Sequence, residues 1–325
     1  RAVRLTMAAS ITSDVARAAD VIRRGGLAAF ATETVYGLGA NALDPIAAAR
    51  IFEAKQRPGF DPLIVHIADT AMLEGLVQDI PDAAAKLIDR FWPGPLTLVL
   101  KKKAIVPDIV TSGLETVGVR LPDHALAREL IRLAGVPIAA PSANLFGHVS
   151  PTSAEHVAEQ LGDRIDIILD GGPCRVGLES TVLDLSGTEP ILRRPGGATL
   201  ESIEAVIGQV RIGASIATGA AAPAPGMLDR HYSPRTPFRL WKPEEPVPTG
   251  NVGLLTWRHP AGDSRFNRTI DLSPTGNLVE AAANLFKAMR DLDAAGLDLI
   301  LATTFPDEGL GRAINDRLRR ASARG

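Results

Sequence analysis

Cysteine is almost absent from this sequence. The 325 residues contain one cysteine, Cys174, which excludes an internal disulfide and any metal site that needs several thiolates. No stretch approaches the roughly 20 unbroken apolar residues of a membrane span, and the N-terminus lacks the charged, apolar and cleavage-site series of a secretory leader. These absences predict a cytoplasmic protein without a membrane anchor, in which Cys174 is a packing residue and not a nucleophile.

Aromatic residues and net charge are also low. Phe, Trp and Tyr make up 4% of the chain, so stacking platforms for nucleic-acid bases are scarce. Lys and Arg number 35 against 37 Asp and Glu, and the formal net charge of -2 gives no general attraction to a phosphate backbone. Tight direct binding of nucleic acid is therefore not expected. A nucleotide stays possible, because a small polyanion depends on its pocket and not on the total charge.

Several standard catalytic motifs are missing. The glycine-bearing segment 32–39 is neither a G-x-x-x-x-G-K-[ST] loop nor a G-x-G-x-x-G turn. The six histidines show no H-E-x-x-H spacing, and Ser180 does not occupy a G-x-S-x-G elbow. The sequence thus lacks the signatures of a zinc hydrolase and of a serine hydrolase. Any metal is expected to be Mg²⁺ held by nucleotide phosphates, which needs few protein ligands, and no organic cofactor is indicated.

Strand and helix patterns alternate along most of the chain. The length suggests two domains, and the 46% hydrophobic and 22% charged residues are typical of a globular protein. Residues 1–210 predict an α/β sheet domain, and residues 237–325 repeat the alternation as a small second α/β domain. Between them, residues 211–236 are rich in Ala, Gly and Pro, which favours a semi-extended linker.

Local signals fix some boundaries. Ser13 or Asp14 is expected to cap a helix that ends at Gly25-Gly26, and Asp44-Pro45 opens a second helix that runs to about Lys55. A buried strand is predicted at 27–32. The segment 32–39 after it is interpreted as a polar loop whose glycines permit close approach of a ligand.

Two short polar motifs are candidates for a site. Lys55 and Arg57, at the end of the second helix, can converge on phosphate oxygens, although cations there often only complement the helix dipole. Ser142 and Asn144 follow a short apolar strand and therefore lie at a strand end, where ligands bind in α/β sheets. The alternative for this pair is an ordinary polar turn. Ser150, in the next loop, is not explained as a helix cap.

Two further candidates come from strand alternation. His66 points away from the apolar face of strand 63–68, and Arg120 points away from Val119 and Leu121 in strand 117–121. Both polar side chains are thus candidates for one site. The alternatives are a partly exposed histidine and a structural ion pair of Arg120.

Five motifs in this order resemble those of the YrdC-like threonylcarbamoyl-AMP synthases. They are Thr-Glu-Thr-Val-Tyr-Gly-Leu-Gly at 32–39, Lys-x-Arg-Pro at 55–58 followed by Pro-Leu-Ile-Val-His at 62–66, Gly-Val-Arg-Leu-Pro at 118–122, Pro-Ser-Ala-Asn at 141–144 and Glu-Ser-Thr-Val at 179–182. The resemblance covers about residues 12–208. The linker with His-Tyr-Ser-Pro at 231–234 and the small C-terminal domain resemble the longer, two-domain members.

The resemblance implies a fold and a site. The fold is α/β, with a twisted mixed sheet and helices around a deep cavity, then a small Rossmann-like C-terminal domain. The implied catalytic tetrad around the ATP phosphates consists of Lys55, Arg57, Ser142 and Asn144. Threonine-site positions are Thr34, His66, Arg120, Ala140 and Ser180. The other ATP-site positions are Asp61, Thr116, Ser150 and Arg194, with His231 and Tyr232 folding over the same cavity.

The implied reaction joins L-threonine, bicarbonate and ATP into threonylcarbamoyl-AMP and releases pyrophosphate. Because a carbamate oxygen attacks the α-phosphorus, no protein nucleophile is required, and catalysis depends on positioning and on cations. Arg120 suits a bidentate grip on the threonine carboxylate. A carboxylate near the triphosphate, such as Asp61, needs Mg²⁺ or a water between them. The product is expected to pass to a transferase that modifies tRNA with threonylcarbamoyladenosine.

Two other functions stay open beside this one. An RNA-binding module would use a concave basic surface, but the near-neutral charge and few aromatic residues count against it. A carbamoyl-transfer domain like that of hydrogenase-maturation proteins would need acylphosphatase-like and zinc modules beside it. For the linker and second domain the hypothesis is a lid that shields labile intermediates from water, and the alternative is a part that only adds stability or a protein contact.

Overall fold

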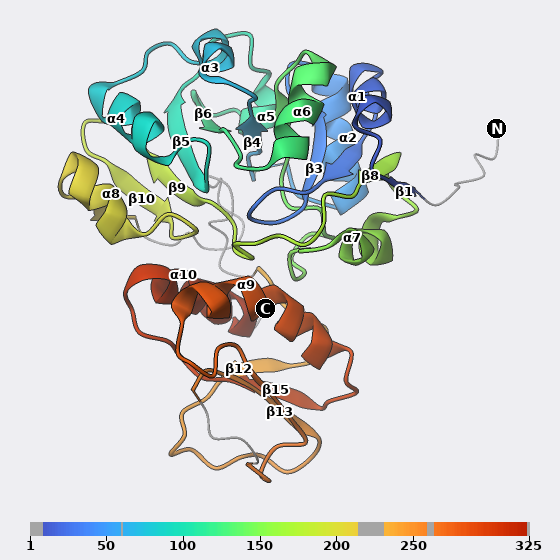
Figure 1. Cartoon of the computed structure of the whole chain (residues 1–325), viewed down its shortest axis with the longest axis vertical. Helices are drawn as coiled ribbons and strands as arrows, with labels where there is room; N and C mark the ends of the chain where they lie inside the picture. Colours follow the sequence, from blue (N-terminus) through green and yellow to red (C-terminus); the bar gives the residue numbers. More distant parts are fainter. Residues whose placement is uncertain (1–8, 60, 214–230, 259–262, 324–325) are drawn as a thin grey trace.

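The computed structural model describes residues 9–59, 61–213, 231–258 and 263–323, which form two α/β domains (Figure 1). The strands of the first domain are β1 (Ser10–Thr12), β2 (Ala28–Phe30), β3 (Gly37–Asn41), β4 (Ile64–His66), β5 (Leu96–Lys101), β6 (Thr116–Arg120), β7 (Ile138–Ala139), β8 (Ile167–Leu169), β9 (Thr181–Asp184), β10 (Ile191–Arg194) and β11 (Arg211–Ile212). They form one mixed sheet in the order β1-β8-β2-β3-β7-β4-β6-β5-β9-β10-β11.

Helices of the first domain pack around this sheet. They are α1 (Val15–Arg23), α2 (Pro45–Lys55), α3 (Thr70–Leu76), α4 (Asp82–Phe91), α5 (Asp108–Thr111), α6 (Ala125–Ala134), α7 (Ala154–Leu161) and α8 (Leu200–Ile207). Asp14 caps α1 by accepting from the backbone N–H of Arg17 at 3.0 Å. Asp44 caps α2 in the same way, with Pro45 in the first turn. Both predicted helix starts are confirmed.

The segment 32–39 is not wholly the loop that the sequence predicts. Gly37–Asn41 form β3, which pairs antiparallel with both β2 and β7. A Cβ at Gly39 would lie 2.7 Å from Cγ2 of Ile138 and 2.8 Å from Cε1 of Phe30, so glycine is required there for close packing. The prediction was wrong because glycine carries no side chain and therefore hides the alternation by which a strand is recognised.

The pairing of β4, β6 and β7 places the predicted polar residues side by side. β4 runs parallel to β6, and His66 lies opposite Arg120 in the register. β4 is also antiparallel to β7, whose strand end leads directly into the Pro-Ser-Ala-Asn motif. Since residues opposite each other in a register share one face, strand alternation correctly places His66 and Arg120 together.

The second domain is a small parallel α/β unit. Its elements are β12 (Phe238–Leu240), β13 (Val252–Thr256), β14 (Arg268–Asp271), α9 (Leu278–Asp293), β15 (Leu299–Ala302) and α10 (Gly309–Ser322). The four strands pair in the order β12-β15-β13-β14, all parallel. Figure 1 shows α9 and α10 between this sheet and the first domain. The predicted architecture, a large mixed sheet followed by a small α/β domain, is confirmed.

The two domains share a buried apolar interface. Leu178 of the first domain belongs to one hydrophobic cluster with Phe286 and Met289 of α9. Gly177, with φ of +70°, lies so close to α9 that a Cβ would be 2.6 Å from Cα of Ala283. An approach this close indicates a packed interface and not a loose tether.

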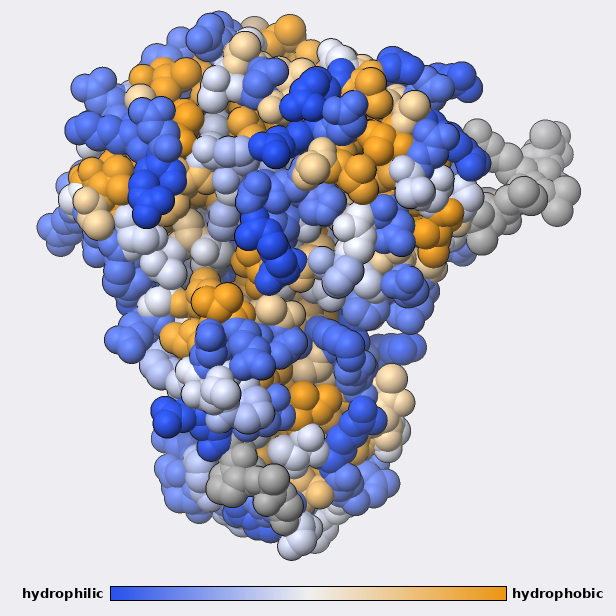
Figure 2. All heavy atoms as spheres, in the orientation of Figure 1, coloured by the Kyte–Doolittle hydropathy of each residue, from blue (hydrophilic) through white to orange (hydrophobic). Residues whose placement is uncertain are grey.

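The segment between the domains begins later than the sequence suggests. Arg211 and Ile212 form β11, which pairs with β10, so the first sheet extends beyond residue 210. Residues 214–230, most of the expected linker, lie outside the described residues. In Figure 2 polar residues cover much of both domains, with apolar patches scattered among them. Within the described part of the chain, no helix is both long and apolar enough to span a membrane.

Candidate active site

A small cavity opens at the strand ends of the first domain and is covered by the segment that enters the second. Its free space amounts to about 50 Å³. Ten of the fifteen predicted site residues line it: Thr34, Arg57, His66, Arg120, Ala140, Ser142, Ser180, Arg194, His231 and Tyr232. Segments far apart in the sequence therefore meet at one place.

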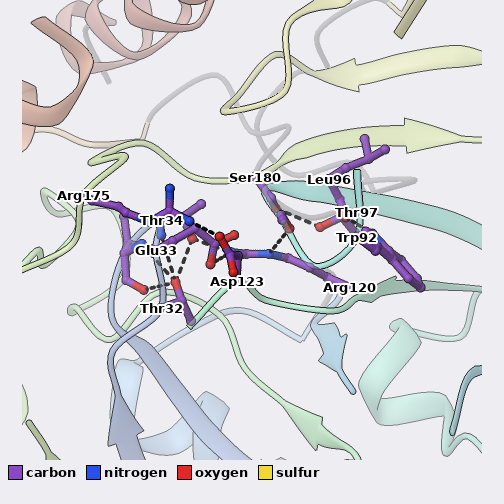
Figure 3. Close-up of polar contacts among 12 residues, drawn as sticks. Thr32, Glu33, Thr34, Trp92, Leu96, Thr97, Arg120, Asp123, Arg175 and Ser180 are labelled. Atoms are coloured by element: carbon purple, nitrogen blue, oxygen red, sulfur yellow. Dashed lines mark hydrogen bonds and ion pairs between the residues drawn. The ribbon is translucent and has the colours of Figure 1, made fainter. Parts of the chain in front are cut away.

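Arg120 organises one end of this cavity (Figure 3). Its Nη2 forms an ion pair with Oε2 of Glu33 at 2.6 Å, its Nη1 donates to Oγ1 of Thr34 at 2.9 Å, and its Nε donates to the carbonyl of Gly94 at 3.2 Å. The side chains of Arg120 and Glu33 are both buried. These contacts leave one N–H on each terminal nitrogen, which is the arrangement that a carboxylate can bridge.

His66 lies beside Arg120 and is buried. Burial and the neighbouring Arg120 guanidinium lower the pKa of His66 from 6.5 to about 3. Its ring also meets the Phe30 ring edge-on, with centroids 6.0 Å apart. A neutral imidazole of this kind can accept or donate a hydrogen bond without adding charge to this end of the cavity.

Ser180 lies in the cavity wall beside Arg194. Its hydroxyl lies 2.8 Å from Oγ1 of Thr97, and its carbonyl accepts from Nη2 of Arg194 at 2.9 Å. Arg194 is also buried, which lowers its pKa. Ser180 thus fixes the orientation of a cation that faces the cavity.

The predicted tetrad is held mainly by main-chain carbonyls. Lys55 Nζ donates to the carbonyls of Ser142 and Asn144, each at 2.5 Å, and burial lowers the pKa of Lys55 well below its usual value. Lys55 and Asn144 lie behind the cavity wall, whereas Arg57 and Ser142 reach it. The lysine therefore joins the end of α2 to the Pro-Ser-Ala-Asn turn.

Asp61 is placed differently from the sequence expectation of a nucleotide contact. Its carboxylate forms an ion pair with Nη2 of Arg57 at 2.8 Å, and its carbonyl accepts from Nε of the same arginine. Both side chains are buried, and Asp61 does not line the cavity. Asp61 thus orients Arg57, and this pair removes the charge conflict that a carboxylate beside a triphosphate would create.

Two other predicted nucleotide positions lie away from the cavity wall. Ser150 is buried and donates to Oε1 of Glu179 at 2.5 Å. Thr116 lines a separate small hollow with Leu63 and Val99. Ser150 therefore contacts Glu179, which lines the cavity, but does not line it itself. Thr116 lies outside the cavity.

His231 and Tyr232 cover the side of the cavity that lies opposite the sheet. The Tyr232 ring stacks on Phe286 of α9 with centroids 5.5 Å apart, and the guanidinium of Arg317 from α10 lies 5.3 Å from the Tyr232 ring centroid. Burial and nearby cations lower the pKa of His231 well below its usual value. The second domain thereby supplies the base on which this cover rests.

Sequence reasoning missed three residues that support the cavity. Glu33 and Glu179 occur inside quoted motifs, next to Thr34 and Ser180, and their positions were a signal that could have found them. Arg317 occurs in a helix rich in arginine and gives no such signal. Among the described residues, no group of three or more His, Cys, Asp and Glu side chains is arranged to hold a metal ion.

This fold and cavity define a member of the Sua5/YciO/YrdC family, whose model, described as telomere recombination, matches residues 20–196. Residues 198–323 match the model described as the threonylcarbamoyl-AMP synthase C-terminal domain. The chain thus belongs to the two-domain threonylcarbamoyl-AMP synthase family.

Individual relatives agree over nearly the full length. The threonylcarbamoyl-AMP synthase of Pyrococcus abyssi is 48% identical, over 94% of this chain and 93% of the relative. The enzyme of the same description from Bacillus subtilis is 47% identical, over 95% and 92%. A crystal structure of P. abyssi Sua5 complexed with L-threonine has a TM-score of 0.87, 47% identity and coverage of 95% and 94%.

Proposed function

We propose that this protein makes threonylcarbamoyl-AMP from L-threonine, bicarbonate and ATP, with release of pyrophosphate. The observation that carries the proposal is a single cavity with two unlike ends. Arg120, Thr34 and neutral His66 at one end suit an amino acid, while Arg57 and Arg194 at the other suit phosphates. The related P. abyssi protein has been crystallised with L-threonine.

At the amino-acid end, the two unused N–H groups of Arg120 hold the threonine carboxylate. Glu33 keeps the guanidinium in place, so little orientation is lost when the substrate binds. Recognition of threonine over serine requires more than a contact with its methyl group, because one methyl discriminates only modestly. The hydroxyls of Thr34 and Ser180 and the ring of His66 are the candidates for bonding the threonine hydroxyl.

The chemistry starts with the amine of threonine and bicarbonate, which combine to a carbamate with loss of water. A carbamate oxygen then forms a bond to the α-phosphorus of ATP, and the bond to the pyrophosphate oxygen breaks. Arg57 and Arg194 stabilise the negative charge that develops on the departing group. No side chain forms a covalent intermediate, and the reaction is an adenylyl transfer.

Mg²⁺ is proposed to enter with ATP, held by phosphate oxygens and water. The acids close to the cavity are already paired with arginines, Asp61 with Arg57 and Glu179 with Arg317. A metal that needs few protein ligands fits this set. When bound, the metal would add positive charge on the phosphates, and Arg57 and Arg194 would orient them.

The His231-Tyr232 segment is proposed to move during the cycle. The present free space of about 50 Å³ is far below the several hundred Å³ that ligand sites for molecules of this size usually have. ATP therefore enters only after these rings withdraw. Their return excludes water, which would otherwise protonate the carbamate, so that it loses CO2, and would hydrolyse the adenylate.

A direct test is incubation of the protein with ATP, bicarbonate and L-threonine, followed by mass detection of threonylcarbamoyl-AMP. We expect the product with pyrophosphate in equal amount, and its loss when any one substrate is omitted. ATP converted without a threonine-containing product would contradict the proposal. Consumption of the product by a tRNA threonylcarbamoyl-transferase, added with tRNA, tests the proposed hand-over separately.

A further inference from the structure

One arginine crosses from the second domain to the cavity wall. Arg317, on α10, is fully buried. Its Nε is 3.0 Å from Oε2 of Glu179, and its Nη1 donates to the carbonyl of Pro195 at 2.6 Å. The same guanidinium lies over the ring of Tyr232. These three partners belong to the cavity or to the segment beside it. Nη1 of Arg317 also pairs with Asp316 of α10 at 3.0 Å, and Arg320 of the same helix shares that carboxylate.

The ion pair between Arg317 and Glu179 matters because of where Glu179 lies. It lines the cavity together with Arg194 and Tyr232, on the side proposed for the nucleotide, and is almost fully buried. A buried carboxylate repels a triphosphate strongly, because the low dielectric around it screens little. Among the described residues, the cation within ion-pair distance of Glu179 is Arg317.

The other acids near the cavity follow the same rule. Glu33 is paired with Arg120 and Asp61 with Arg57, at 2.6 Å and 2.8 Å. In those two pairs both partners come from the first domain. Of these three pairs, the one at Glu179 takes its cation from the other domain. The charge balance of the cavity is therefore incomplete without α10.

We propose that Arg317 is a positioning residue for ATP, which neutralises Glu179 and so permits a triphosphate to bind beside it. This inference rests on the function proposed above, since it assumes that the occupant of that end is ATP. It goes further by assigning to the second domain a charge that the nucleotide site needs. Arg317 itself acts through Glu179 and Tyr232 and is not a catalytic residue.

A purely structural role of Arg317 makes a different prediction. If the side chain only joins the domains, its loss weakens every ligand or none, and a neutral residue at 179 does not help. If it balances Glu179, the loss falls on ATP, and removing the carboxylate reverses it. A double-mutant cycle separates the two cases, because it measures the coupling between the two positions directly.

The experiment measures the Kd of ATP and of L-threonine by isothermal titration calorimetry for full-length variants. We expect Arg317→Met to weaken ATP about tenfold or more, as loss of one partner of a buried charge pair does, with threonine within about twofold. Adding Glu179→Gln to Arg317→Met should restore most of the ATP affinity. Glu179→Gln alone should leave ATP binding unchanged or tighter.

Two variants control for folding and for interface loss. Arg317→Lys keeps the charge but loses the planar group that also reaches Pro195 and Tyr232, so it should weaken ATP less than Arg317→Met does. Arg312→Met removes another arginine of α10, which pairs with Glu201 of the first domain at 2.9 Å, partly exposed and away from the cavity. It should leave both Kd values unchanged. If Arg317→Met does not fold, Arg317→Lys and Glu179→Gln still decide.

Three results would overturn the inference: unchanged ATP binding in Arg317→Met, no rescue by Glu179→Gln, or weaker ATP binding in Glu179→Gln alone. The last would mean that the carboxylate itself serves the nucleotide. Because binding is measured without turnover, these results are distinct from failure of the proposed function. That failure would appear as a wild-type protein that forms no threonylcarbamoyl-AMP.

Discussion

Arg120 and Arg57 are both buried and both paired with an acid, yet the walls around them come from different parts of the chain. Around Arg120, the partners Glu33, Thr34 and Gly94 belong to the first domain. Around Arg57, the cavity is closed by His231 and Tyr232, which rest on helices of the second domain. The end proposed for the amino acid is thus complete within one domain, and the end proposed for the nucleotide requires both.

This difference predicts which parts of the molecule should affect the binding of each substrate. Threonine binding should depend on the first domain alone, because its contacts are held by strands of a single sheet. ATP binding should respond to any change that shifts α9 or α10. A variant that affects one substrate and spares the other would sharpen this division, and variants that affect both equally would break it.

The largest effects are expected at the two arginines themselves. Arg120→Ala and Arg57→Ala should each lower kcat/KM about 100-fold or more, because each removes a proposed contact to substrate and deprives a buried acid of its arginine. Arg120→Ala should raise the KM of threonine, and Arg57→Ala the KM of ATP. Steady-state kinetics with each substrate varied in turn checks this.

The matched control is Arg132→Ala, which removes an exposed arginine paired with Glu129 on α6. It should change kcat/KM little, since exposed pairs contribute little to stability or function. If both cavity variants raised the same KM, the two ends would not be separate sites.

The next effect concerns stability at the amino-acid end. Glu33→Gln should lower the free energy of unfolding by about 3 kcal/mol, because it leaves the charge of buried Arg120 without its partner. Urea denaturation measures this. The control Glu129→Gln, in an exposed pair, should change stability by about 0.5 kcal/mol or less.

Threonine should stabilise Glu33→Gln more than the wild type, because its carboxylate can replace the missing acid beside Arg120. A thermal shift with and without threonine tests this. An equal shift in both proteins would place the threonine carboxylate away from Arg120.

A smaller effect is expected at the His231-Tyr232 segment that covers the cavity. Tyr232→Ala should weaken ATP about tenfold and leave threonine unchanged, because it removes the ring that packs on Phe286 and under Arg317. Tyr232→Phe keeps the ring and is the control. Among the described residues the Tyr232 hydroxyl has no hydrogen-bond partner, so its loss should matter little.

If Tyr232→Phe were as weak as Tyr232→Ala in ATP titrations, the hydroxyl would contact the nucleotide directly. If neither variant changed ATP binding, the cover would not belong to the nucleotide end, and the division between the two ends would fail.

The sequence predicts the amino-acid end better than the nucleotide end, for a physical reason. His66 and Arg120 were found because strand alternation and a fixed register place such residues on one face. The strand β3 was missed because Gly37 and Gly39 hide that alternation. The periodicity of apolar and polar residues thus predicts a site only in strands whose side chains show which face each residue occupies.

At the nucleotide end, long-range packing decides the arrangement. No local pattern indicates that Asp61 turns to Arg57 instead of the phosphates, or that Arg317 of α10 reaches Glu179. In each case several acids and arginines could pair in other ways, and the amino-acid types alone do not decide among these pairings. The Arg57–Asp61 pair is made within the first domain, between residues four apart. The contact between Arg317 and Glu179 follows from how the domains dock, which depends on features such as the close approach at Gly177.

The smallest effect is a pH dependence of stability that comes from His66. Its pKa is about 3 in the folded protein and 6.5 when unperturbed, so below 6.5 the unfolded state binds a proton that the folded state does not. The stability that His66 contributes is therefore complete above pH 6.5 and declines as the pH falls toward 3. Between pH 7 and pH 6 the decline should be about 0.7 kcal/mol.

Comparison of the wild type with His66→Gln isolates this decline, because all other titrating groups are shared. Urea denaturation at pH 7 and pH 6 should show the difference in unfolding free energy shrinking by that amount. A difference that stays constant would mean that His66 titrates alike in the folded and the unfolded protein. Below pH 6.5 the end proposed for the amino acid would then carry a second positive charge beside Arg120, and its selectivity for a single carboxylate would need another explanation.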